Sequence, residues 1–168
     1  MTRPGFREYL LLVLLALMWG SSFTFIKIGV HAYSPLVVAS GRLAFAALVL
    51  WCLALIRKSE MPTGRRAWIS TFMVALVGNA IPFFLISFGE IKVDAGLAAI
   101  LMSTVPLTTV VLAHFFTQDE KLSTGKVIGV ILGTIGVIVL VGPETLSGLG
   151  GEFLFQLAIL VAAIGYAI

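Results

Sequence analysis

Six long apolar stretches determine what this chain can fold into. A bilayer core is about 30 Å thick and is crossed by roughly 20 consecutive apolar residues in an α-helix. Because lipid offers no hydrogen-bond partner to backbone N–H and C=O groups, such stretches must be helical. The pattern therefore predicts an all-α integral membrane protein. The predicted spans are residues 9–30, 35–56, 68–89, 95–116, 124–142 and 153–168.

Composition excludes a soluble domain. Of the 168 residues, 60% are hydrophobic and 11% are charged, whereas soluble domains are about 45–50% apolar and about 25% charged. The net charge of +3 gives no basis for binding nucleic acid. A single cysteine, Cys52, and two distant histidines, His31 and His114, form no recognisable metal site. We expect a lipid bilayer and a small solute as partners, with no cofactor, no metal and no catalytic residue.

The first apolar stretch bears on whether a signal peptide is cleaved from the chain, and the last bears on whether the chain is part of a longer protein. Arg3 and Arg7 precede the first stretch, as in a secretory signal peptide. That stretch is too long for a typical signal peptide and lacks a small-residue cleavage site, so an uncleaved anchor is favoured. The last stretch reaches Ile168 without a cap, a flanking charge or an exit loop. We therefore expect the chain to be part of a longer protein.

The basic residues predict the orientation, because Lys and Arg accumulate in cytoplasmic loops. The opposite side carries only Lys27 and Lys92, and the loop at 143–152 has no basic residue. We expect a cytoplasmic N-terminus. After five crossings, the stretch at 153–168 begins on the outside, as in the inverted repeats of secondary transporters. If every stretch crosses, eight basic residues share the side of the N-terminus: Arg3, Arg7, Arg57, Lys58, Arg65, Arg66, Lys121 and Lys126.

Polar residues at similar depth predict a substrate site between helices. A rise of 1.5 Å per residue places Trp19, Ser21, Ser22, Asn79, Ser103, Thr104 and Thr108 near mid-membrane. Pro82 and Pro106 predict kinks, since proline removes a backbone hydrogen bond and clashes with the carbonyl four residues back. Such a layer suits one shared cleft. Alternatively, each Ser and Thr bonds to its own helix and the prolines only shape packing.

Arg42 is the strongest single indication of function. It lies about 10 Å inside the outer end of its helix, where an arginine costs about 2.5–3.5 kcal/mol on insertion scales. Glu90 and Asp94 are candidate counter-charges. A structural ion pair, a guanidinium bonded to loop carbonyls, and a contact to a substrate carboxylate or phosphate are all open.

Acidic residues are absent from the middle of every stretch. A proton-driven carrier usually places a carboxylate or histidine at depth. Either the coupling group lies in a further half of the protein, or the protein is an exchanger or facilitator.

Glycines at a four-residue spacing mark a close helix contact in the fifth stretch. Gly125, Gly129 and Gly133 recur with that spacing, and small residues let helix backbones approach closely. The contact lies within the fold or at a dimer face. A contact within the fold is favoured, because the helix always has neighbours inside the fold.

Several short motifs follow one another along the chain. They are Trp19-Gly20-Ser21-Ser22-Phe23, Pro35 followed by Ala39-Ser40-Gly41-Arg42-Leu43, Asp94-Ala95-Gly96-Leu97-Ala98-Ala99 leading to Pro106, and Glu120-Lys121-Leu122 before the glycines. Taken in this order, the motifs resemble the EamA domain of the drug/metabolite transporter superfamily. The resemblance covers nearly the whole chain.

This resemblance implies a five-helix repeat at 1–142, an outer loop at 143–152, and the start of a second, inverted repeat at 153–168. It further implies ten helices in all, a central cavity, and export of small metabolites, often amino-acid-like, across a bacterial inner membrane. Glu120 falls on a family position and would order a cytoplasmic loop through an ion pair. Asp119 stands where the family has a turn glycine.

The sequence thus predicts a secondary transporter that works by alternating access together with a second half or a second copy. The alternatives are a non-transporting assembly subunit and a short carrier active only as a dimer. A membrane enzyme is disfavoured, because neither a Gly-x-Ser-x-Gly context nor His-Glu-x-x-His occurs. The substrate, the direction of transport and the coupling ion are left open.

Overall fold

The computed structural model describes residues 5–59, 61–116, 123–141 and 152–167, and the regular elements in these ranges are all helical. The predicted all-α class is therefore confirmed. Glu120 and most of the predicted outer loop lie outside the described residues. The helices are α1 (Phe6–Ala32), α2 (Pro35–Ile56), α3 (Arg65–Ala75), the π-helical turn η1 (Leu76–Ala80), α4 (Ile81–Gly89), α5 (Ala95–Met102), α6 (Val105–Phe116), α7 (Thr124–Val141) and α9 (Phe153–Ala167).

The protein is a multi-pass membrane protein. Large apolar side chains cover the outside of the bundle: Leu17 and Leu48, for example, are 64% and 63% exposed. Lipid is the solvent that such a surface requires. Thr124–Gly136 and Phe153–Ala167 are shorter apolar helices. Within the described ranges, four helical segments are long and apolar enough to cross a membrane: Phe6–Ala32, Pro35–Ile56, Arg65–Gly89 and Ala95–Phe116.

Local side-chain chemistry sets the helix ends. The backbone N–H of Gly5 donates to Oε2 of Glu8 at 2.8 Å, so α1 begins ahead of the predicted span. The Oγ of Ser34 accepts from the backbone N–H of Val37 at 3.4 Å and caps α2. Pro35 then takes the first helical position, where its missing N–H costs nothing.

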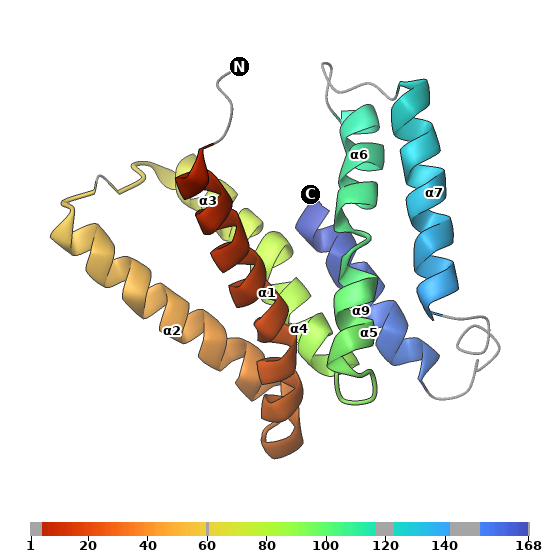
Figure 1. Ribbon diagram of the computed structural model, residues 1–168. Helices are drawn as coiled ribbons and strands as arrows, with labels where there is room; N and C mark the ends of the chain where they lie inside the picture. Colours follow the sequence, from red (N-terminus) through yellow and green to blue (C-terminus); the bar gives the residue numbers. More distant parts are fainter. Residues whose placement is uncertain (1–4, 60, 117–122, 142–151, 168) are drawn as a thin grey trace.

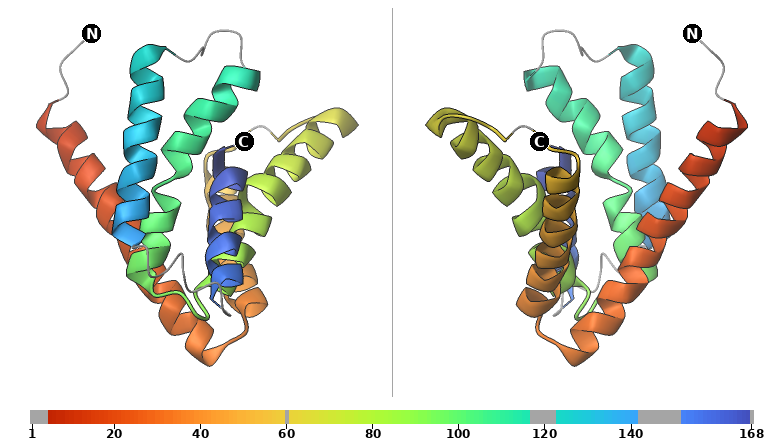
Figure 2. Two further views of the ribbon diagram at one scale, coloured as in Figure 1. Left: turned by 90° about the vertical axis from the view of Figure 1, so that its right-hand side faces the viewer. Right: turned by 90° about the vertical axis from the view of Figure 1, so that its left-hand side faces the viewer.

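Both prolines stand at interruptions of long helices. Pro82 is the second residue of α4 and follows the π-helical turn η1 almost directly. Pro106 is the second residue of α6, and Ser103 and Thr104 lie between the end of α5 and the start of α6. Proline leaves a carbonyl one turn back without its helical partner. The third span therefore consists of α3, η1 and α4, and the fourth consists of α5 and α6. The break between α5 and α6 is visible as a bend in Figure 2.

The helices converge at one end of the molecule and splay at the other (Figures 1 and 2). The α1–α2 turn, the α4–α5 turn and the start of α9 lie at the converging end, here named the narrow end. The starts of α1 and α3 and the end of α6 lie at the opposite, wide end. The core gathers toward the narrow end and consists of Phe23, Ile26, Ile86, Val93, Ala98, Leu101, Met102, Ile159, Ala162 and Ala163.

Helix α9 packs against α4, η1, α5 and α6. Small residues permit the close approach: a Cβ added at Gly89 would lie 2.7 Å from the carbonyl oxygen of Phe155, and one added at Gly165 would lie 2.8 Å from Cγ of Pro82. The rings of Phe88 and Phe155 stack with their centroids 4.9 Å apart. The segment after the loop is thus packed into the helices that precede it.

The glycine stripe of α7 makes one close contact. A Cβ added at Gly133 would lie 2.8 Å from Cδ2 of Leu107 in α6. At Gly125 and Gly129 an added Cβ would meet no atom within 4 Å among the described residues. Gly133 therefore packs inside the fold, whereas the other two positions face away from the described helices.

Candidate substrate-binding site

Arg42 reaches from α2 to α1 and meets one of the predicted polar residues there. Its Nη2 donates to Oγ of Ser22 at 2.9 Å, and its guanidinium carbon lies 4.5 Å from the ring centroid of Phe83 in α4. The hydrogen bond and the cation–π contact hold the charge inside the bundle. Nη1 of Arg42 is buried and has no hydrogen-bond partner in the part of the chain that the structure describes. The N–H groups of Nη1, at one edge of the planar guanidinium group, therefore remain as unpartnered donors.

A pocket of about 610 Å³ lies between α1 and α2 beside this arginine. Small-molecule sites have volumes of about 300–1,000 Å³ and combine apolar walls with a few polar groups that fix orientation. This pocket fits both descriptions. Its lining consists of Met18, Ser21, Ser22, Phe25, Ile26, Val38, Arg42 and Phe45.

Lys27 contacts both Glu90 and Asp94, the two residues that the sequence offers as counter-charges of Arg42. Nζ of Lys27 donates to the backbone carbonyls of Glu90 at 2.8 Å and Val93 at 2.9 Å, and lies 3.7 Å from Oδ1 of Asp94. Asp94 is 92% exposed, so its ion pair contributes little. The Glu90 side chain is fully buried, and both Lys27 and Arg42 act on its charge.

Lys27→Met is expected to lower the free energy of unfolding by about 2–3 kcal/mol, because it removes two charge-assisted hydrogen bonds between α1 and the α4–α5 turn. Thermal or denaturant unfolding in detergent micelles measures the loss. Lys92→Met, which removes an exposed lysine from the same turn, is the matched control and should stay within about 0.5 kcal/mol of the unchanged chain. Equal losses of unfolding free energy in both variants would contradict the conclusion that Lys27 stabilises the contact between α1 and the α4–α5 turn.

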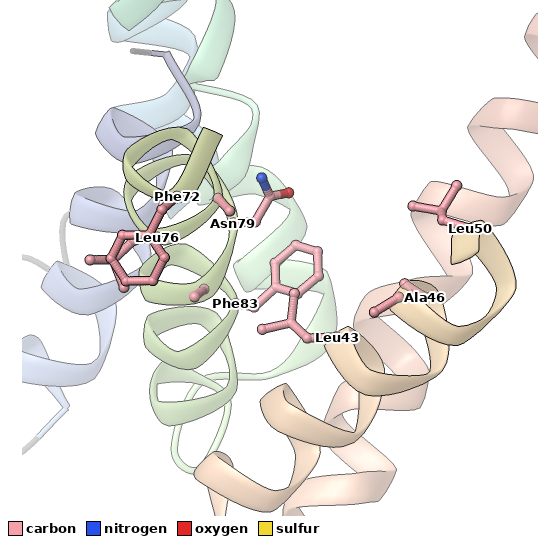
Figure 3. Close-up of a pocket in the computed structure, with 10 residues that line it drawn as sticks. Leu43, Ala46, Leu50, Phe72, Leu76, Asn79 and Phe83 are labelled. Atoms are coloured by element: carbon pink, nitrogen blue, oxygen red, sulfur yellow. The ribbon is translucent and has the colours of Figure 1, made fainter. Parts of the chain in front are cut away.

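Three of the other predicted polar residues, Asn79, Thr104 and Thr108, line two further pockets. Asn79 lines one of about 430 Å³ between α2 and the α3–α4 segment, and Figure 3 shows the Phe83 ring between Asn79 and Leu43. Thr104 and Thr108 line another, of about 490 Å³, bounded by α6, α7 and α9. The single shared cleft that the sequence predicts is therefore divided among three pockets.

Most hydroxyl groups of the predicted layer bond to their own helix, which is the alternative that the sequence left open for them. Ser22 differs, because its Oγ accepts from Arg42. Trp19 is 55% exposed and is not among the residues that line the pocket beside Arg42. The hydroxyls that donate to a backbone carbonyl three or four residues earlier, at distances between 2.6 and 3.1 Å, are those of Ser21, Ser103, Thr104 and Thr108.

Three further residues surround the site without lining its pocket, and the sequence did not single them out as site residues. In the sequence, Lys27 is identifiable only as a basic residue on the outer side. Its place within a long apolar helix was the available signal. The ring centroids of Phe83 and Tyr166 lie 6.1 Å apart, so Tyr166 is next to the ring that Arg42 contacts. Aromatic residues are common throughout such helices, so no pattern distinguished these two.

Comparison with known proteins gives one family and several relatives. The model of the EamA-like transporter family matches residues 6–142. The chain is 26% identical to the uncharacterized transporter YoaV of Bacillus subtilis, over 94% of this chain and 53% of that protein. It is 27% identical to an uncharacterized transporter of Archaeoglobus fulgidus, over 94% of this chain and 55% of that protein.

A third relative is the uncharacterized inner membrane transporter YedA of Escherichia coli, with 30% identity over 80% of this chain and 43% of that protein. The chain thus spans about half the length of the curated relatives that it matches. No solved structure matches it.

Proposed function

This chain belongs to the EamA-like transporter family, and from that premise we propose that it forms one half of a secondary transporter for a small polar or amphipathic metabolite. The relatives named as transporters support the general activity. The observation that carries the proposal is the pocket between α1 and α2, which is lined by the half-buried Arg42, whose buried Nη1 has no partner among the described residues.

The chemistry of the pocket indicates the class of solute. A guanidinium group is a planar donor that matches carboxylate and phosphate oxygens. The remaining lining is mostly apolar, with Ser21 and Ser22 as the other polar residues. A solute with one anionic oxygen group and a small apolar body, such as an amino-acid-like metabolite, satisfies both parts. Arg42 would orient the anionic group and the phenyl rings would cover the remainder.

The distribution of basic residues supports an orientation. Arg57 and Lys58 follow the end of α2, and Arg65 and Arg66 begin α3; both of these helix ends lie at the wide end (Figure 1). By the positive-inside rule, that end faces the cytoplasm, together with the N-terminus. The helices then pack together at the outer end and separate toward the cytoplasm, which is the arrangement that receives a solute for export. Release on the other side requires the alternate conformation.

Transport also requires a second half. The matched relatives extend well beyond the region that this chain covers. Either a second, inverted repeat that begins with α9 or a second copy of the chain would complete the path. Inverted repeats that enclose a mid-membrane site are a common design of secondary transporters.

Solute flux in proteoliposomes tests the proposed function. The 168-residue chain and the full reading frame that contains it are reconstituted separately, with empty liposomes as the control. The liposomes are loaded with labelled amino acids, nucleosides, sugars or organic cations. We expect efflux of carboxylate-bearing solutes above the control. Inserted protein without flux of any solute in either preparation would overturn transport and favour a non-transporting assembly subunit.

A further inference from the structure

Glu90 is a buried carboxyl group that the proposed substrate site does not use. It follows directly after Gly89, the last residue of the third membrane span, and lies at the narrow end. Its exposed fraction is 0%, and neither Oε1 nor Oε2 has a hydrogen-bond partner among the described residues. An ionised carboxylate buried without hydrogen bonds is strongly disfavoured, so such a group takes up a proton instead.

The cations near Glu90 are engaged elsewhere. Lys27 of α1 donates to the backbone carbonyls of Glu90 and Val93 rather than to the Glu90 side chain. Arg42 of α2 directs Nη2 to Ser22. Both act on Glu90 through their charge, but neither forms a hydrogen bond with its carboxyl oxygens. The charge of the carboxylate is thus only partly compensated.

The remaining charged and titratable groups around this position are few among the described residues. Tyr166 of α9 lies next to the Phe83 ring, which Arg42 contacts. Lys92 and Asp94 belong to the same turn as Glu90 and are exposed. Burial raises the pKa of Glu90 to about 8, against the opposing effect of the positive charges of Lys27 and Arg42. The protonated, neutral form of the group therefore predominates at pH 7 in this conformation.

We propose that Glu90 is a proton-binding site of this chain and that closure of the narrow end takes up a proton there. In the closing step a proton from the water at that end adds to the carboxylate and forms the O–H bond of a carboxylic acid. In the reverse step the acid meets water and releases the proton. Coupling of this step to solute movement rests on the proposed function, whereas proton binding itself does not.

The direction of the pH effect follows from linkage. A solvated Glu90 in an open conformation would titrate near the ordinary value of about 4.3, well below the value in the closed conformation. The proton-dependent stabilisation of the closed form is therefore complete below about pH 4 and is lost as the pH rises through about 8. Between these limits, closing consumes a proton.

Infrared spectroscopy of the chain in lipid bilayers tests proton binding without any transport assay. The C=O band of a protonated carboxylic acid is followed from about pH 5 to about pH 10. We expect a band that disappears around pH 8, is absent from Glu90→Gln, and persists in Glu152→Gln, which removes an exposed carboxylate. In Lys27→Gln the loss of the band should move to higher pH, because a cation that favours the ionised form is gone. A titration unchanged in Glu90→Gln would overturn the proposal.

Cysteine labelling tests the link to closure. In a Cys52→Ser background, Val93→Cys reports on a residue of the narrow end that is 3% exposed, and Lys92→Cys provides an exposed reference for thiol ionisation. We expect the labelling ratio of position 93 to position 92 to rise by up to about tenfold per pH unit and to level off above about pH 8. With Glu90→Gln the ratio should stay low throughout. A ratio independent of pH in the chain that retains Glu90 would overturn the link.

These measurements separate the two proposals. A titrating band together with pH-dependent labelling, but without solute flux, would support proton binding at Glu90 and count against transport. Flux with no titrating band would support transport and count against Glu90 as the proton site.

Discussion

Arg42→Gln is expected to abolish solute flux while the protein still inserts and folds. The amide keeps one donor for Ser22 but loses the charge that lies over Phe83 and that would meet an anionic solute. Removing one partner of a buried, hydrogen-bonded charge pair costs about 3 kcal/mol or more, which corresponds to at least about 100-fold in affinity. Insertion should not suffer, because an arginine inside the membrane is itself costly.

Flux from proteoliposomes at matched protein content measures this effect, and the membrane fraction of the expressed protein reports insertion. Arg42→Lys keeps the charge but not the planar donor geometry, and we expect partial activity. Arg66→Gln removes an exposed arginine at the wide end and should leave flux unchanged. Undiminished flux in Arg42→Gln would exclude the arginine from the substrate site. Failure of that variant to insert would assign it to folding instead.

Gly89→Ala is expected to destabilise the fold by about 3 kcal/mol. The added Cβ would lie 2.7 Å from the backbone carbonyl oxygen of Phe155 and would also collide with Cγ1 of Ile159. A backbone atom cannot move aside as a flexible side-chain end does, so α4 and α9 must separate. Overpacking of this kind costs about 1–3 kcal/mol and occasionally more.

Thermal unfolding in detergent micelles compares this variant with Gly129→Ala, the matched control. An added Cβ at Gly129 meets nothing within 4 Å among the described residues. Because alanine favours the helix over glycine by about 1 kcal/mol, the control should be as stable as the unchanged chain or slightly more stable. Similar stability of the two variants would show that the contact between α4 and α9 relaxes without cost.

Much of the fold follows from the sequence by itself. The predicted spans at 35–56 and 95–116 coincide with the bounds of α2 and of α5 and α6 together. Hydropathy is decisive here, because in lipid every backbone group must find its partner within the helix. Pro82 and Pro106 likewise stand at interruptions, since each lacks the N–H that a continuous helix needs.

The candidate site was predictable only in part. Arg42 was identifiable because a charge inside an apolar helix is costly and needs a reason. Its neighbour Ser22 belonged to the predicted layer, but nothing in the chain distinguished it from Ser103, whose Oγ bonds to its own helix. A hydroxyl in a helix has a local acceptor always within reach. Only the position of the facing helix decides which partner it takes.

The role proposed for Glu90 also depends on the tertiary structure and not on the sequence alone. Its position at a helix end, where carboxylates are ordinarily solvated, does not distinguish it in the sequence from an exposed acidic residue. Its burial is a property of the packing of the narrow end. The sequence determined that these helices lie in lipid, approximately where they begin and end, and that one arginine lies among them. Tertiary structure alone decided which polar groups meet and which carboxyl group loses water, because helix rotation and crossing depend on side-chain contacts between segments far apart in the chain.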